Sequence, residues 1–215
     1  MKSKRAKLFF LTILLIMTSL NMHAQKRSAI TIKTGDLLFR ETVSGNLSKA
    51  IDQVTQTEKQ THFSHIGLAV IEHDSVYVLH ASPNGGTCKV RFAEFSHPKG
   101  DSTQVTIYRL KAAYQSAIPT AITQANTLLG KPYNFSYVLS DTSHYCSEFI
   151  YLAFEADSIF KLNPMTFIDP KTGEFAATWI TYYQQLGMDV PEGLPGCNPN
   201  GMAASPKLER IGIID

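Results

Sequence analysis

The segment Ser143-His144-Tyr145-Cys146-Ser147-Glu148 decides how the rest of the sequence is interpreted. Apolar residues at helical spacing follow it, so a helix is predicted to begin at Cys146 and to run to about Ala156. A cysteine in the first turn of a helix faces unpaired backbone N–H groups, whose partial positive charge favours the thiolate form. The segment therefore indicates a nucleophile, although a lone cysteine at such a place is more often a small buried hydrophobe.

The first two dozen residues have the pattern of a secretory signal. Four basic residues precede the apolar run Leu8 to Met17, and a polar exit leads to a cleavage site after Ala24. The run is short for a membrane span, so cleavage is favoured over an uncleaved anchor. We therefore expect a signal peptide at 1–24, one folded domain at 25–215 and a periplasmic or otherwise exported protein.

Charge and cysteine content narrow the function classes. The whole chain carries 20 basic and 18 acidic residues, and removal of 1–24 leaves 16 basic against 18 acidic ones. No basic cluster remains, so nucleic acid is not expected as a partner. An odd cysteine count in an exported chain suggests one disulfide and one free thiol, and the pair considered is Cys88 with Cys197, which leaves Cys146 free.

The remaining pattern predicts an α+β domain with an antiparallel sheet. The turn at Gly35-Asp36 precedes a short buried strand, and Asp36 is expected first of all to cap that turn. The other elements follow from apolar periodicity. Helices are predicted at 47–58, 119–129 and 174–186, and strands at 66–72, 75–81, 87–92 and 104–110.

A base for the thiol is predicted from the register of one hairpin. If His73-Asp74 forms a two-residue turn, Glu72 pairs with Ser75, and His80 becomes a diagonal neighbour of His65 on the same sheet face. The two imidazoles can then form a hydrogen bond, with His65 as base and His80 as its orienting group. Glu72 is excluded from that role because it points to the opposite face.

The same histidines and Cys146 allow a zinc site as an alternative. His62, His65, His80 and Cys146 could be drawn as ligands, but the spacing of the two first histidines suits a helix better than a strand entry. We therefore expect no metal and no cofactor. His144 and His97 are expected in loops, and His144 could also line the pocket because it is two residues from Cys146.

Several segments together resemble the circularly permuted papain-like hydrolases of the YiiX/YaeF type, which are relatives of the NlpC-type cell-wall peptidases. The matching segments are Gly35-Asp36-Leu37-Leu38, Ser64-His65-Ile66-Gly67-Leu68, Val78-Leu79-His80-Ala81, Gly130-Lys131-Pro132-Tyr133-Asn134-Phe135, Tyr145-Cys146-Ser147-Glu148-Phe149-Ile150-Tyr151 and Trp179 to Tyr183.

The resemblance implies a small antiparallel sheet or partial barrel with the cysteine helix packed against it. It also implies Cys146 as nucleophile, His65 as general base and His80 as third polar residue, where such enzymes often have a glutamate. An oxyanion would be held by the backbone N–H of Cys146 and a further donor. Tyr133 and Tyr145 are the candidates, and Asp36 completes the set of possible substrate contacts.

Three functions are compatible with this reading. The first is an exported cysteine amidase or peptidase that cleaves peptides of the cell envelope. The second is an enzyme of the same fold that hydrolyses or transfers lipid amides or esters, with aromatic residues lining an acyl groove. The third is an envelope binding module without turnover, which would have no unusually reactive thiol. The oligomeric state is left open.

Overall fold

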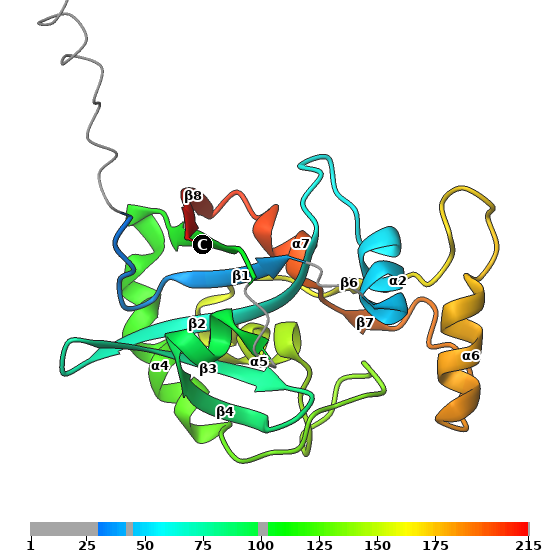
Figure 1. Cartoon of the computed structure of the whole chain (residues 1–215), viewed down its shortest axis with the longest axis horizontal. Coiled ribbons are helices and arrows are strands. Elements are labelled where there is room, and N and C mark those ends of the chain that lie inside the picture. Colours follow the sequence, from blue (N-terminus) through cyan, green and yellow to red (C-terminus); the bar gives the residue numbers. More distant parts are fainter. Residues whose placement is uncertain (1–29, 42–44, 99–102, 215) are drawn as a thin grey trace, which may run out of the picture.

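The protein is described by a computed structural model that covers residues 30–41, 45–98 and 103–214. A six-stranded antiparallel sheet forms its centre, in the order β4-β3-β2-β1-β5-β8 (Figure 1). The sheet is open, with β4 and β8 at its edges. The strands are β1 (Leu37–Glu41), β2 (Phe63–Glu72), β3 (Ser75–Ser82), β4 (Gly86–Arg91), β5 (Val105–Leu110) and β8 (Leu208–Ile214).

Helices lie on both faces and at one end of this sheet. In Figure 1, α4 and α5 lie against the sheet, whereas α2 and α6 lie beyond its end. The helical segments are α2 (Asn46–Val54), α3 (Phe92–Ser96), η2 (Ala112–Ala117), α4 (Ile118–Thr127), α5 (Cys146–Ala153), η3 (Glu155–Asp157), α6 (Ala177–Gln185) and α7 (Pro199–Ala203). The short strands β6 (Asn163–Pro164) and β7 (Pro195–Gly196) pair separately. The predicted α+β class is confirmed.

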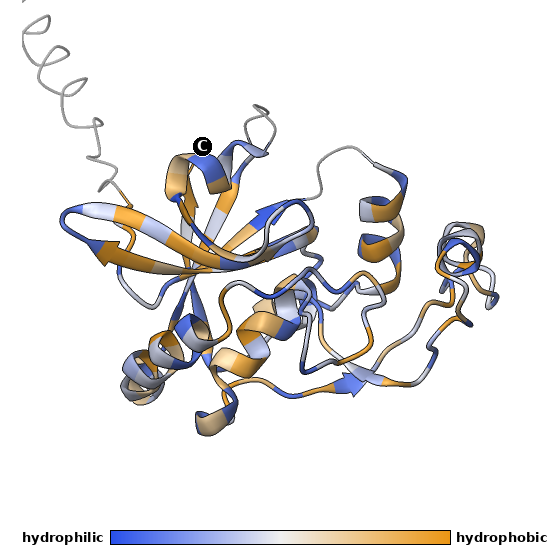
Figure 2. Cartoon of the chain, turned by 90° about the horizontal axis from the view of Figure 1, so that it is seen from below, coloured by the Kyte–Doolittle hydropathy of each residue, from blue (hydrophilic) through white to orange (hydrophobic). Residues whose placement is uncertain are grey.

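Apolar side chains from both faces of the sheet form the core. The larger cluster joins β1, β2 and β3 to α4 and α5, and Phe149 and Ile150 of α5 are fully buried in it. Figure 2 shows long hydrophobic stretches in these strands and in α5. A second cluster lies on the opposite face around Phe95, and a third joins α2 to α6. The cysteine helix is therefore held on the sheet by burial of its apolar residues.

The hairpin between β2 and β3 has the predicted register. Glu72 pairs with Ser75, and the ladder continues to Leu68 and Leu79. His73 and Asp74 both have positive φ, 46° and 60°, as a two-residue turn that matches strand twist requires. The one-residue slip that would have turned His80 to the opposite face does not occur.

Other predicted elements need correction. The helix predicted at 47–58 ends at Val54, and the one predicted at 174–186 begins at Ala177. Phe92 opens the short helix α3 instead of ending a strand. The strand β8 was not predicted. The signal segment 1–24 lies outside the described residues, and no described helix is both long and apolar enough to cross a membrane.

Candidate active site

Cys146 is the first residue of α5, as the sequence predicts. Glu148 fixes this end of the helix because its carboxylate accepts bonds from the backbone N–H groups of Tyr145, at 3.1 Å, and Ser140, at 2.9 Å. A glutamate that reaches back to the residue before the helix satisfies one of the unpaired N–H groups there. The position of the cysteine is thus set by its own helix and by the preceding loop.

The sulfur of Cys146 lies beside the first half of β2, which is not paired with β3. Pairing between these strands stops at Leu68 and Leu79, and the backbone N–H of Ile66 donates to the sulfur, as does that of Ser147. Burial nevertheless dominates and raises the pKa of the Cys146 thiol to about 11. The expectation of a resting thiolate is therefore corrected, because desolvation outweighs the N–H groups of the helix start.

His65 and His80 form the predicted pair. His65 Nε2 lies 2.8 Å from His80 Nδ1, and both side chains are buried. Gly67 makes room for this approach, since a Cβ there would lie 2.4 Å from Val78 Cγ1 and 3.4 Å from His80 Cβ. The ring of Phe95 packs against both imidazoles, with centroid distances of 5.6 Å and 5.3 Å. The two side chains thus have little freedom to rotate.

Both imidazoles are neutral at physiological pH. Burial, followed by the charge of Arg40, holds the pKa of His65 well below its usual value and lowers that of His80 to about 3. Because His65 Nε2 faces His80, the Nδ1 atom of His65 is the one left to accept a proton. Ile66, whose N–H contacts the sulfur, directly follows His65, so the sulfur lies beside the strand that carries the proposed base.

The two tyrosines proposed as oxyanion donors differ in their surroundings. Tyr145 Oη accepts the backbone N–H of Cys197 at 3.2 Å and lies 3.8 Å from its sulfur, so this hydroxyl is engaged by the segment before α7. Tyr133 lines the pocket at Cys146, and the charge of a Cys146 thiolate would raise its pKa further. Of these two tyrosines Tyr133 is the one that lines the pocket, and its hydroxyl forms a hydrogen bond with that of Tyr137.

Asp36 stabilises the turn before β1, which is the structural role expected for it. Its carboxylate accepts the Lys33 N–H at 2.7 Å and forms two bonds with Arg109, at 2.6 Å and 2.7 Å. It is fully buried and is not part of the pocket at Cys146. The alternative expectation, a substrate contact, is not supported, because both oxygens are occupied by the turn and by β5.

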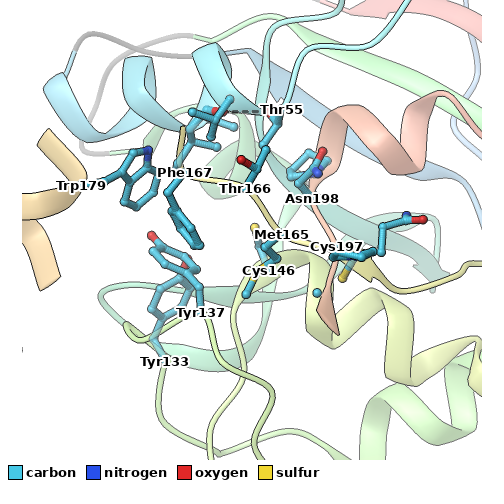
Figure 3. A pocket seen from close by; sticks show the side chains of 17 residues that line it. Thr55, Tyr133, Tyr137, Cys146, Met165, Thr166, Phe167, Trp179, Cys197 and Asn198 are labelled. Atoms are coloured by element: carbon cyan, nitrogen blue, oxygen red, sulfur yellow. Dashed lines mark hydrogen bonds between the residues drawn. The ribbon is translucent and has the colours of Figure 1, made fainter. Parts of the chain in front are cut away.

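A cavity of about 140 Å³ opens beside Cys146. Figure 3 shows aromatic side chains on one side of the cysteine and Cys197 with Asn198 on the other. The pocket is lined by Ile51, Val54, Thr55, Ser64, Tyr133, Tyr137, Cys146, Asn163, Pro164, Met165, Thr166, Phe167, Trp179, Gly196, Cys197, Asn198 and Pro199. None of these side chains carries a full charge, so the pocket suits a neutral, largely apolar group.

The other cysteines and His144 differ from expectation. All three cysteines are free thiols, so the suggested pair of Cys88 with Cys197 is wrong. Cys197 lines the pocket at Cys146, whereas Cys88 lies in a separate pocket beside His80. His144 is buried, with its Nδ1 atom 3.4 Å from Glu148 Oε1, and does not line the pocket.

Sequence reasoning missed several residues of the site. Tyr137, Phe167 and Trp179 line the pocket from a loop, from the segment after β6 and from α6. Arg40 lies directly opposite His65 in the β1–β2 ladder. A single sequence holds no signal for such long-range pairing; only the charge of Arg40 at the end of an apolar strand was visible.

The fold and the buried cysteine–histidine arrangement define a class of protein, the papain-like cysteine hydrolases. A family model described as "Permuted papain-like amidase enzyme, YaeF/YiiX, C92 family" matches residues 31–212. The chain therefore belongs to this family and is an enzyme, an amide hydrolase. This membership argues against the envelope binding module.

Two relatives support the assignment. The chain is 31% identical over 124 residues to the uncharacterized protein YiiX of Escherichia coli K12, and this match covers 57% of each chain. A crystal structure described as metalloprotein yiiX from Escherichia coli O157:H7 has the same fold, with a TM-score of 0.67 and 22% identity over 84% of this chain and 96% of that one.

That relative is described as a metalloprotein, so the possible metal ligands of this chain bear on the comparison. Within residues 30–41, 45–98 and 103–214, no group of three or more His, Cys, Asp or Glu side chains is placed to hold one metal ion. The described side chains thus do not fit a metal centre.

Proposed function

We propose that this enzyme hydrolyses amide bonds through Cys146, His65 and His80, as an exported protein acting on peptides of the cell envelope. The observation that carries the proposal is the 2.8 Å contact of the two buried imidazoles next to the residue whose N–H contacts the Cys146 sulfur. The export rests on the sequence of 1–24 alone.

The proposed reaction starts from neutral groups. His65 Nδ1 takes the thiol proton while the sulfur forms a bond to the carbonyl carbon, and the protonated His65 then gives that proton to the leaving amine. His80 Nδ1 accepts the His65 Nε2–H bond and holds the ring in the tautomer that leaves Nδ1 free. Water then hydrolyses the thioester. The Cys146 N–H and the Tyr133 hydroxyl would bind the oxyanion.

The reactivity of Cys146 tests this chemistry. With iodoacetamide near neutral pH, we expect Cys146 to be modified roughly 10²-fold more slowly in His65→Ala than in the wild type, because the general base is lost. The rate is measured by peptide mass spectrometry. His73→Asn is the matched control, since His73 is exposed at the β2–β3 turn, lines neither the pocket at Cys146 nor the one beside His80, and asparagine tolerates its positive φ. Equal rates in His65→Ala and wild type would contradict the proposed base.

The pocket supports a second candidate, hydrolysis of lipid amides or esters. It contains no charged lining residue and four aromatic ones: Tyr133, Tyr137, Phe167 and Trp179. Burial of an unpaired carboxylate in such a pocket costs several kcal/mol. An envelope peptide would have to present a neutral, apolar residue to fit.

A pair of matched substrates distinguishes these cases. We expect the coumarin amide of hexanoic acid to be cleaved at least about 10-fold faster, in kcat/KM, than that of glutaric acid, whose acyl group ends in a carboxylate. In Thr166→Lys the difference should shrink, because Thr166 lines the pocket and the new ammonium would pair with the carboxylate. Preference for the charged acyl group in the wild type would contradict a neutral pocket occupant.

A further inference from the structure

Arg40 lies beside the histidine pair and lines a pocket together with His80, outside the pocket at Cys146. It stands directly opposite His65 in the β1–β2 ladder, so the two side chains leave the same face of the sheet. Arg40 Nη1 donates to the Phe95 carbonyl at 2.9 Å, and its Cζ atom lies 4.8 Å from the centre of the Phe95 ring. This is the ring that packs against His65 and His80.

The guanidinium of Arg40 has no acidic counter-ion in the described part of the chain. None of the ion pairs found there includes it, and its Nε atom is buried without a hydrogen-bond partner. Burial lowers the pKa of Arg40 to about 10, and the negative charge of Cys146 opposes that decrease. A buried charge without a partner is costly, so packing alone does not account for an arginine here.

Six titratable groups face the Cys146 sulfur or its base from the surrounding elements: Arg40 on β1, His65 on β2, His80 on β3, Tyr133 and Tyr137 in the loop before α5, and Cys197 before α7. Burial lowers the pKa values of both histidines and raises those of both tyrosines and of Cys197. Among these six, the guanidinium alone is charged at neutral pH. The separate pocket lined by Arg40 and His80 also contains Cys88, His97 and the exposed Glu94, and none of the described ion pairs joins Glu94 to Arg40.

We propose that Arg40 is the positioning residue that supplies the positive charge for the Cys146 thiolate, so that the thiolate is paired with a guanidinium and not with an imidazolium. This proposal rests on the proposed function. The same charge repels a proton on either histidine and keeps both neutral. His65 then carries the proton from sulfur to the leaving amine without remaining charged in the resting enzyme, and no electron transfer or further reactant is involved.

The pH profile of Cys146 alkylation tests the proposal in the full chain. In Arg40→Gln, which keeps an N–H donor for the Phe95 carbonyl but removes the charge, we expect the midpoint of the profile to rise by about one pH unit or more. In Arg40→Lys, which keeps the charge, it should stay close to the wild-type value. Arg91→Gln is the control, because Arg91 is exposed and lines neither the pocket at Cys146 nor the one beside Arg40, so the Cys146 midpoint should stay at the wild-type value.

A purely structural role of Arg40 predicts different results for the two variants. It would lower the thermal midpoint or the alkylation rate at every pH, without moving the pH midpoint and without rescue by lysine. An unchanged midpoint in Arg40→Gln would overturn the proposal. Turnover by Cys146→Ala, in contrast, would overturn the proposed function and not the pairing of charges.

A measurement on the wild type keeps the test independent of how the variants fold. We expect the C2–H resonances of His65 and His80 to show no protonation as the pH falls from 8 to about 5, because Arg40 and burial favour the neutral rings. The resonances are assigned through bonds from the backbone of each histidine. An imidazolium on His65 near pH 7 would overturn the proposal.

Discussion

Replacing Cys146 by alanine is expected to lower turnover of a model amide by roughly 10⁴-fold to 10⁶-fold, as removal of a covalent nucleophile does elsewhere. The Cys146 sulfur accepts the backbone N–H of Ile66, the residue that follows His65. Without the sulfur only water in the cavity remains as a nucleophile, and water is far weaker than a thiolate. Initial rates with the coumarin amide of hexanoic acid measure the effect.

Cys88 provides the matched control for this substitution. It is a free thiol that lies directly opposite His80 in the β3–β4 ladder but outside the pocket at Cys146. Cys88→Ala should keep a rate close to the wild-type one, which would show that this second thiol beside the histidine pair is not the nucleophile. A thermal unfolding curve of each variant shows whether the fold is retained. Substantial turnover by folded Cys146→Ala would exclude the covalent mechanism.

Replacing Asp36 by asparagine is expected to lower the free energy of unfolding by about 3–5 kcal/mol, because it leaves a partly buried guanidinium without its partner. The Asp36 side chain is 1% exposed and that of Arg109 is 16% exposed, and two of their atom pairs lie at 2.6 Å and 2.7 Å. The pair joins the turn before β1 to β5. The midpoint and slope of urea unfolding give the change.

An exposed ion pair serves as the comparison for Asp36. Lys89 and Glu72 join β4 to β2 with side chains that are 30% and 43% exposed. Glu72→Gln should therefore change the unfolding free energy by less than about 1 kcal/mol. If both substitutions had the same small effect, burial would not be what makes the Asp36 pair important.

Local patterns predicted the parts of the site that depend on one helix or one hairpin. Cys146 begins α5 because apolar residues at helical spacing start there, and His80 meets His65 because a two-residue turn fixes the register. Alternation along a strand then determines which side chains share a face. Two residues fifteen positions apart could thus be placed together from the sequence alone.

Features that depend on distant parts of the chain were not predictable in this way. Strand β8 pairs with β5 across about a hundred residues, and Arg40 meets His65 only because β1 pairs with β2. The ionisation of Cys146 was predicted in the wrong direction because the helix start is visible in the sequence and the burial around it is not. Competing effects of this kind require the packed structure.

At the end of the β2–β3 ladder, acylation of Cys146 is coupled to a backbone hydrogen bond of β2. The Cys146 sulfur takes the place of a strand carbonyl as acceptor for the Ile66 N–H. Once an acyl group is attached, the sulfur becomes a weaker acceptor, and this amide loses its partner until deacylation. Amide hydrogen exchange at a single peptide group in the sheet would then report occupancy of the enzyme by substrate or inhibitor.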